Sequence, residues 1–148
     1  MGNARFLVGV EAAVYHSGRY LFIRRSRHDA DAPGLLALPA GTVEVEPAGE
    51  GILEGTARRE VREEAGVEVE DAVYFVQSKT FSLDAERPVV DAVFLCRYRS
   101  GEAHPDGVET EDVFWLTQAE LAAREDAADW LQRTVALCEA KRRDLGWV

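Results

Sequence analysis

One amphipathic helix is predicted near the middle of the chain, between two groups of strand-like segments. Apolar residues recur at every fourth position from Leu53 to Ala65, and the pattern stops at Gly66. This spacing places them in one stripe along a helix, which another part of the molecule must cover. A helix of this kind between strands predicts a sheet with the helix packed on one of its faces.

The segments around this helix have the composition of β-strands. Residues 6–15 and 20–24 are rich in β-forming side chains and are separated by the turn-like sequence His-Ser-Gly-Arg. We therefore expect them to form two paired strands. Further strand-like runs occupy residues 73–81, 89–98 and 113–116.

Two more helices are predicted at the end of the chain. Thr117 can cap a helix from Gln118 to about Arg124, and residues 126–143 carry apolar side chains at helical spacing. Strands interleaved with one helix and followed by two others predict an α/β fold, with helices on both faces of a mixed sheet. With 148 residues, the chain has the length of one compact domain.

Composition and charge argue against several classes of protein. The formal net charge is −10 and there is no dense block of Lys and Arg, so large nucleic acids are not expected partners. No apolar stretch approaches the roughly 20 residues that span a bilayer, and no secretion signal is recognisable. We therefore expect a cytoplasmic protein without membrane partners. Cys96 and Cys138 are predicted to be buried free thiols.

Three carboxylates share one face of the central helix. Glu60, Glu63 and Glu64 stand at positions i, i+3 and i+4, which are neighbours on a helix surface. Like charges at this spacing repel one another, and Arg59 and Arg62 flank the trio without occupying its centre. A hard dication such as Mg2+ or Mn2+ explains the arrangement, because it prefers carboxylate and phosphate oxygens. A solvated surface of mixed charges is the alternative interpretation of the trio alone.

The sequence around the trio resembles the Nudix hydrolase signature, G-x5-E-x7-R-E-U-x-E-E-x-G-U, in which U is an aliphatic residue. Residues 59–67 (REVREEAGV) match every specified position of its second half. The sequence Leu-Pro-Ala-Gly at residues 38–41 resembles the strand and loop that precede the helix in that family. The resemblance implies an α/β/α sandwich with a mixed β-sheet, formed by a single Nudix hydrolase domain over residues 1–148.

The first half of the signature is lengthened in this chain. Between Gly41 and Glu50 the chain has three residues more than the signature, and between Glu50 and Arg59 it has one more. Flexible loops accept extra residues at small entropic cost, so the helix is still expected to present its carboxylates. The role of Glu50 is open, with Glu46 and Glu54 as alternatives.

The resemblance also implies roles for individual residues. Glu60, Glu63 and Glu64 would ligate Mg2+, for which Mn2+ could substitute. The main-chain carbonyl near Ala40 would be a further ligand, and Arg59 would hold a neighbouring carboxylate in place. The implied reaction is hydrolysis of a nucleoside diphosphate linked to another group, in which metal-activated water attacks phosphorus.

A carboxylate must take the proton of the attacking water, and the sequence leaves several candidates. Glu63 and Glu64 are candidates within the helix. In many family members the base comes from a later loop, and here Glu109 has the matching position. Glu111 and Asp112 are close alternatives, and a solvated loop acid is the alternative interpretation of Glu109.

Substrate contacts are expected at the end of the second strand and on one aromatic ring. Arg24, Arg25 and Arg27 form a small basic cluster where the family often contacts phosphate or base. Alternation along a strand allows at most one of Arg24 and Arg25 to face the site, and a surface role for both is the alternative interpretation. Phe81 is a candidate for stacking on a base, with Phe75 and Trp115 as alternatives, although aromatic residues in strands more often belong to a core.

The leading hypothesis is a Mg2+-dependent nucleotide pyrophosphohydrolase that acts on the acid anhydride of a small nucleotide. ADP-ribose, other nucleotide sugars and nucleoside triphosphates are all candidate substrates. The alternative is a nucleotide-binding regulatory module that keeps the fold but has lost turnover. A homodimer is a further hypothesis, because dimers are common in the family and Leu145, Trp147 and Val148 offer an apolar surface.

Overall fold

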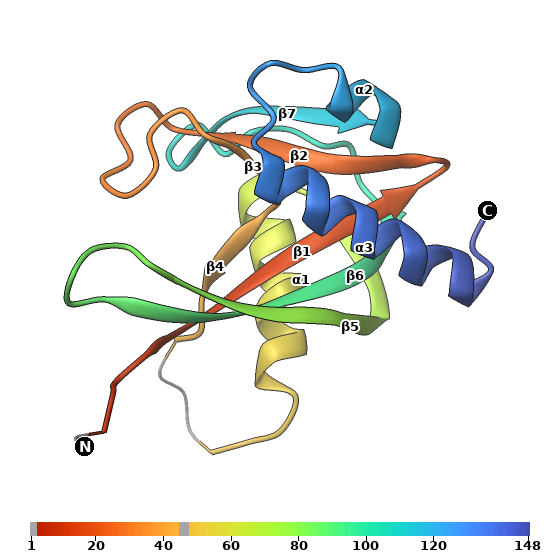
Figure 1. The fold of residues 1–148 in the computed structure, drawn as a ribbon. Helices are drawn as coiled ribbons and strands as arrows, with labels where there is room; N and C mark the ends of the chain where they lie inside the picture. Colours follow the sequence, from red (N-terminus) through yellow and green to blue (C-terminus); the bar gives the residue numbers. More distant parts are fainter. Residues whose placement is uncertain (1–2, 45–47) are drawn as a thin grey trace.

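In the computed structural model, which describes residues 3–44 and 48–148, seven strands form one mixed sheet with helices on both faces (Figure 1). The elements in chain order are β1 (Leu7–His16), β2 (Arg19–Arg25), β3 (Leu36–Ala37), β4 (Ala40–Thr42), α1 (Ile52–Ala65), β5 (Glu68–Ser82), β6 (Pro88–Ser100), β7 (Thr110–Leu116), α2 (Gln118–Ala122) and α3 (Asp129–Leu145). The predicted α/β/α sandwich with a mixed sheet is confirmed.

Strand β1 lies at the centre of the sheet and has three partners. It runs parallel to β6, and β5 follows β6 as an antiparallel edge strand. On its other side, β1 pairs first with β4 and then, only at Tyr15 and His16, with β2. The predicted pairing of the first two strands is therefore limited to the end of their hairpin. Beyond it the strands separate, and β2 pairs with β3 and β7 instead.

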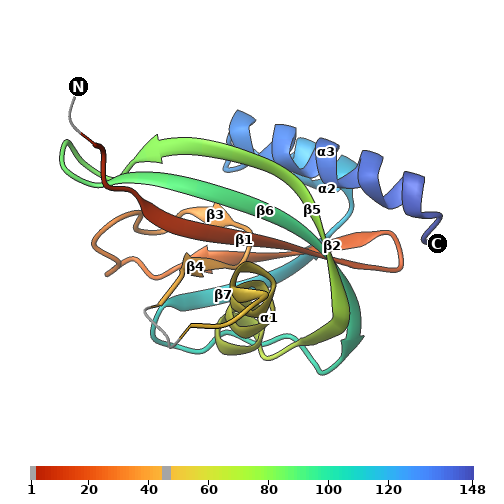
Figure 2. The ribbon, with the colours of Figure 1, turned by 90° about the horizontal axis from the view of Figure 1, so that it is seen from below.

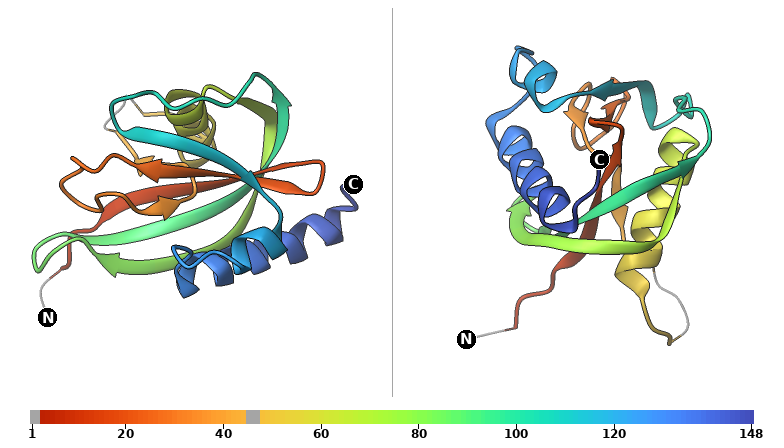
Figure 3. Two further views of the ribbon diagram at one scale, coloured as in Figure 1. Left: turned by 90° about the horizontal axis from the view of Figure 1, so that it is seen from above. Right: turned by 90° about the vertical axis from the view of Figure 1, so that its right-hand side faces the viewer.

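Helices α1 and α3 cover opposite faces of the sheet, as Figures 2 and 3 show from several sides. Alternate side chains of β1 belong to the two cores. Val10, Ala12 and Val14 pack with α1, whereas Ala13 and Tyr15 pack with α3. Because each face of β1 is covered, most of its side chains on both sides are apolar, and the buried carboxylate of Glu11 is the exception.

Helix α1 forms where the apolar stripe predicted it. Ala57, Val61 and Ala65 are fully buried against the sheet. Gly51 and Gly66 bound the helix with φ angles of 67° and 69°, a backbone conformation that residues with a Cβ disfavour. The buried stripe fixes the rotation of the helix about its axis, and so decides which of its charged residues face the neighbouring strand.

Strand β5 is longer than its sequence pattern indicated. It begins at Glu68 rather than near Val73, because Glu68 and Val69 already pair with Ser100 and Tyr98 at the end of β6. Most of these side chains are exposed at the sheet edge, so they give no apolar alternation.

Cys96 and Cys138 are buried free thiols, as predicted. Among the described helices, none combines the length and the apolar composition that crossing a membrane would require.

Candidate active site

Glu60, Glu63 and Glu64 form the acidic face of α1. This face lies directly against strand β4. Gly41 of β4 pairs with Val10 of β1, and a Cβ added at Gly41 would lie 2.2 Å from Cδ and Oε1 of Glu60. The carboxylate of Glu60 therefore packs against the β4 backbone at a distance that only glycine allows.

Glu64 is the most deeply buried carboxylate of the acidic face, with 3% of its surface exposed. Its Oε2 accepts a hydrogen bond from the backbone N–H of Ala40 at 3.1 Å. Burial raises the pKa of Glu64 to about 8, although the Ala40 N–H opposes the rise and the charge of Glu60 adds to it. The sheet thus holds two carboxylates through neighbouring residues of one short strand.

Arg59 runs along the edge of the acidic face. Its Nη2 donates to Oε1 of Glu60 at 3.0 Å and to the carbonyl oxygen of Thr42 at 3.3 Å. Its Nε lies 3.8 Å from Glu63 and its Nη1 lies 3.6 Å from Glu44. One guanidinium therefore ties the helix to the end of β4 and fixes the Glu60 carboxylate between them.

The three carboxylates are not equivalent. The side chain of Glu63 is 58% exposed, whereas that of Glu60 is 10% exposed. Burial raises the pKa of Glu60, Arg59 opposes the rise, and the charge of Glu63 adds to it. Two members of the trio are thus fixed in the protein, and the third projects into solvent.

Glu109 approaches the same carboxylates from the loop before β7. Its main chain is fixed on both sides: its N–H donates to Asp106 Oδ1 at 2.9 Å, and its carbonyl accepts from the Ser26 N–H at 2.8 Å. Its negative charge contributes to the raised pKa of both Glu60 and Glu64. The structure therefore brings Glu109 close to the acidic face, with its own side chain exposed.

The two alternatives to Glu109 have other partners. Glu111 binds the backbone N–H and the guanidinium of Arg27, at 2.7 and 2.9 Å from Oε1. Asp112 accepts from the N–H of Val113 at 2.9 Å and acts electrostatically on Arg124.

Arg24 and Arg25 point in different directions, as alternation requires. The charge of Arg25 opposes the rise that burial causes in the pKa of Glu64, and its Nη2 lies 2.8 Å from Asp29. Arg24 instead binds Asp126 at 2.7 Å and lies over the ring of Phe114. Of the two, Arg25 is the one near the acidic face.

Of the remaining predicted residues, Phe81 lies away from the acidic face. Phe81 is near the end of β5, 44% exposed, and pairs with Val89 on the sheet face that α3 covers. Glu46 lies outside the described residues. Glu50 and Glu54 flank the start of α1, and neither forms an ion pair with a described residue. The roles of these residues stay predictions.

The donor set suits a hard dication. Glu60 and Glu64 are buried carboxylates whose pKa values are raised because nearby positive charge does not balance their burial, and a divalent cation would supply that charge. Among the described residues, however, no three His, Cys, Asp or Glu side chains are grouped closely enough to hold a metal ion. Main-chain oxygens and substrate phosphate oxygens would have to complete the coordination, which Mg2+ commonly accepts.

A second group of buried charges, on the α3 face, was missed from the sequence. Lys79 Nζ lies 2.9 Å from Glu11 Oε2, and Asp91, 3% exposed, lies beside them. Burial and a hydrogen bond with Glu11 raise the pKa of Asp91 to about 9. Gly9 makes room for the group, because a Cβ there would lie 2.6 Å from Asp91 Oδ1. The sequence signal that could have indicated this group is a single carboxylate within each of two apolar strands, Glu11 in β1 and Asp91 in β6.

Comparisons with known proteins agree with this geometry. The family model described as NUDIX domain matches residues 5–138. The NAD-capped RNA hydrolase NudC of Photobacterium profundum is 36% identical over 111 residues, which are 75% of this chain and 38% of that protein. The NudC of Vibrio vulnificus is 35% identical over 96 residues, 65% of this chain and 34% of that protein. The chain therefore spans little more than a third of these relatives.

Solved structures show the same fold. The MutT protein of Methanosarcina mazei has a TM-score of 0.77 at 19% identity, over 97% of this chain and 99% of that one. A MutT NUDIX hydrolase of Burkholderia pseudomallei has a TM-score of 0.72 at 24% identity, over 90% and 98%. The NUDIX domain of Shewanella oneidensis NrtR, solved with ADP ribose, has a TM-score of 0.69 at 22% identity, over 97% and 90%.

Proposed function

Because the chain belongs to the Nudix hydrolase family, we propose that it is a Mg2+-dependent nucleotide pyrophosphohydrolase. The observation that carries the proposal is the placement of Glu60 and Glu64 against the backbone of Gly41 and Ala40. Two buried carboxylates and nearby main-chain carbonyls form a compact set of hard oxygen donors, which suits Mg2+ or Mn2+ beside a phosphate.

Different residues of the site would bind the cation, position a carboxylate and accept the proton. Glu60, Glu64 and the main-chain carbonyl of Ala40 would hold the cation, and Arg59 keeps the Glu60 carboxylate in position through its hydrogen bond. When bound, the cation would activate water and offset the charge that develops on the phosphate oxygens. Glu63 and Glu109 are exposed and can take the proton of the attacking water.

We propose that the substrate is an adenosine diphosphate linked to a second sugar or nucleoside. The NudC relatives are named as hydrolases of NAD-capped RNA, and the NrtR domain was solved with ADP ribose; the NAD cap and ADP-ribose both contain this unit. Arg25 is a candidate to contact a substrate phosphate, because its charge acts on Glu64.

The test is hydrolysis of NAD, ADP-ribose and nucleoside triphosphates with Mg2+, Mn2+ or EDTA, followed by chromatographic identification of products. We expect AMP from NAD and from ADP-ribose, no turnover in EDTA, and at least a hundredfold lower turnover for Glu64→Gln. Glu63→Gln and Glu109→Gln identify the base, since only its loss should remove the acid limb of the pH profile. Glu70→Gln, an exposed carboxylate of β5, is the control.

The second candidate function is a nucleotide-binding regulatory module. The observation that favours it is the lack of three closely grouped metal-ligating side chains among the described residues. Tight binding of ADP-ribose with no turnover on any substrate, in Mg2+ or Mn2+, would establish the module and overturn the pyrophosphohydrolase.

A further inference from the structure

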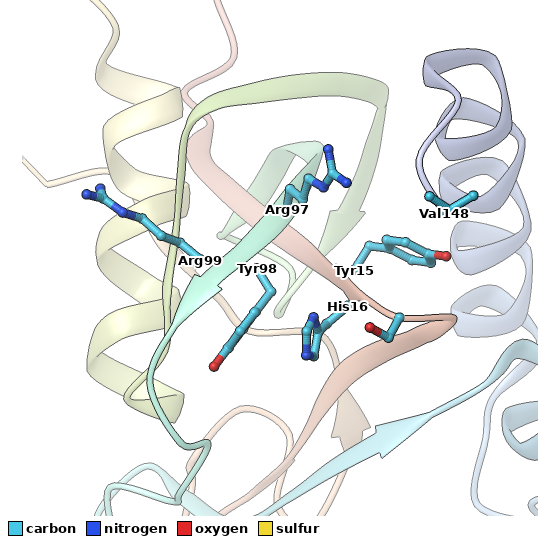
Figure 4. Close-up of a pocket in the computed structure, with 7 residues that line it drawn as sticks. Tyr15, His16, Arg97, Tyr98, Arg99 and Val148 are labelled. Carbon is cyan, nitrogen blue, oxygen red and sulfur yellow. The ribbon is translucent and has the colours of Figure 1, made fainter.

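A basic cleft of about 340 Å3 opens at the end of the sheet remote from β4 (Figure 4). It lies between the β1–β2 turn, the end of β6 and Val148, where Tyr15 pairs with Arg97. Val10 and Glu11 of β1 pair with Gly41 and Ala40 of β4, four to five residues before Tyr15, and a strand rises about 3.3 Å per residue. The cleft is therefore roughly 13–17 Å along the strand direction from the contacts that Gly41 and Ala40 make with the acidic face.

Two arginines that form no ion pair with a described residue line this cleft. Arg97 and Arg99 stand at alternate positions of β6, and neither lies within 4.0 Å of a described carboxylate. Figure 4 shows the Arg97 side chain above His16 and Tyr15 and the Arg99 side chain extending away from them, at the border of the cleft. Most arginines of the described chain do have such a partner, for example Arg24 with Asp126 at 2.7 Å. Arg99 acts at longer range on Glu68. In a chain of net charge −10, this is a local excess of positive charge.

Aromatic rings contact two basic residues of the cleft, Arg97 and His16. The guanidinium of Arg97 lies over the ring of Trp147, 5.4 Å from its centroid, and Trp147 packs on Tyr15 at 6.2 Å. The ring of His16 stacks on that of Tyr98 at 4.1 Å. Figure 4 shows the His16 ring between Tyr98 and Tyr15, with Arg97 above them in the view. A guanidinium held in this way loses little conformational entropy when it binds a ligand.

We propose that the basic cleft is a second binding site, which takes the phosphate group of a nucleotide. Guanidinium groups bind phosphate oxygens through paired hydrogen bonds, and an imidazole adds a further donor. The rings of His16 and Tyr98 offer a surface on which a base can stack. A free mononucleotide and a phosphate of an RNA chain present the same chemistry. The inference does not depend on turnover at the acidic face.

The experiment is an NMR titration of the whole 15N-labelled chain in EDTA with inorganic phosphate, AMP and a short RNA oligonucleotide. We expect amide shifts around Ser17 and Arg99, and tighter binding of AMP than of phosphate. Affinity for RNA at least fivefold above that for AMP assigns the site to an RNA chain. Equal affinity assigns it to a mononucleotide.

The variants Arg97→Gln and Arg99→Gln together should weaken AMP binding at least tenfold. Arg133→Gln removes another exposed arginine without a described acidic partner and should leave the affinity unchanged. Because Arg97 packs on Trp147, thermal unfolding is measured for each variant, and Arg99→Gln alone should weaken binding severalfold. Shifts confined to the acidic face, or equal affinities in Arg99→Gln and Arg133→Gln, would overturn the proposal. The titration contains no metal, so it is independent of hydrolysis.

Discussion

Glu60 lies so close to Gly41 that a Cβ at position 41 would come within 2.2 Å of Glu60 Oε1. This contact joins β4 to α1 without any intervening side chain. The main-chain oxygens of β4 and the carboxylates of α1 can therefore act on the same ion or phosphate. The first glycine of the signature is thus required for a close approach, since it has an ordinary backbone conformation.

Gly41→Ala should displace the Glu60 carboxylate and weaken Mg2+ or Mn2+ binding at least tenfold. The free energy of unfolding should fall by about 1–3 kcal/mol, as for other overpacked sites. Calorimetric titration with Mn2+ and thermal unfolding with and without the metal measure both effects. Gly55→Ala is the control: its Cβ would meet only Arg58 Nη2 at 3.9 Å, and it should stabilise the helix by about 0.5–1 kcal/mol. Undiminished metal binding by Gly41→Ala would refute the assignment.

Arg59→Lys should reduce turnover at least tenfold while changing stability little. Lysine keeps the charge but cannot reach Glu60 and the Thr42 carbonyl with one planar group, so the Glu60 carboxylate loses its fixed orientation. Arg62→Lys is the matched control, because Arg62 pairs with Glu68 in an exposed ion pair of little energetic value. The measurement is the steady-state turnover of both variants on whichever of NAD, ADP-ribose and the nucleoside triphosphates the parent chain hydrolyses fastest. Equal turnover in the two variants would show that Arg59 does not position Glu60.

Gly66→Ala should destabilise the protein more than Gly34→Ala. Both positions have φ near 70°, which costs a residue with a Cβ about 1–2 kcal/mol. A Cβ at Gly66 would in addition lie 2.3 Å from Nε2 of His104, whereas Gly34 faces open space. Urea unfolding of the two variants separates backbone strain from steric contact. Equal losses of unfolding free energy in the two variants would contradict the prediction and would mean that the His104 ring moves aside at no cost.

The sequence predicted the acidic face but not the difference between its members. Helical spacing places Glu60, Glu63 and Glu64 together, since that is a local property of the chain. Which of them is buried depends on Gly41 and on the N–H of Ala40, about 20 residues earlier in the sequence. No local pattern reports such a contact. The resemblance to the family was needed to connect the two segments.

The fold was predicted well where segments are long and periodic, and less well elsewhere. Strand β4 has three residues, too few for alternation to be recognised, and so its place beside β1 was not foreseen. The buried group of Glu11, Lys79 and Asp91 comes from three strands that meet only through sheet register. The sequence shows one carboxylate in each of β1 and β6, Glu11 and Asp91, but it does not show that the two are neighbours in the fold.

This buried group makes stability depend on pH in a direction opposite to that of a paired surface carboxylate. Burial raises the pKa of Asp91 to about 9, whereas in the unfolded chain it ionises near pH 4. The folded state therefore keeps a proton that the unfolded state has released. The stabilisation due to this proton is fully present below about pH 4 and is lost as the pH rises through about 9.

Asp91→Asn should flatten the fall in unfolding free energy between pH 5 and pH 9. The amide has nearly the shape of the protonated carboxyl but cannot ionise, so folding no longer takes up a proton there. Urea unfolding in EDTA at several pH values measures the slope, and comparison with the parent chain cancels the contribution of Glu64, whose pKa is also raised. Asp71→Asn, at an exposed position of β5, should keep the parent slope. A parent-like slope in Asp91→Asn would mean that Glu11 holds the proton, with Asp91 ionised beside Lys79.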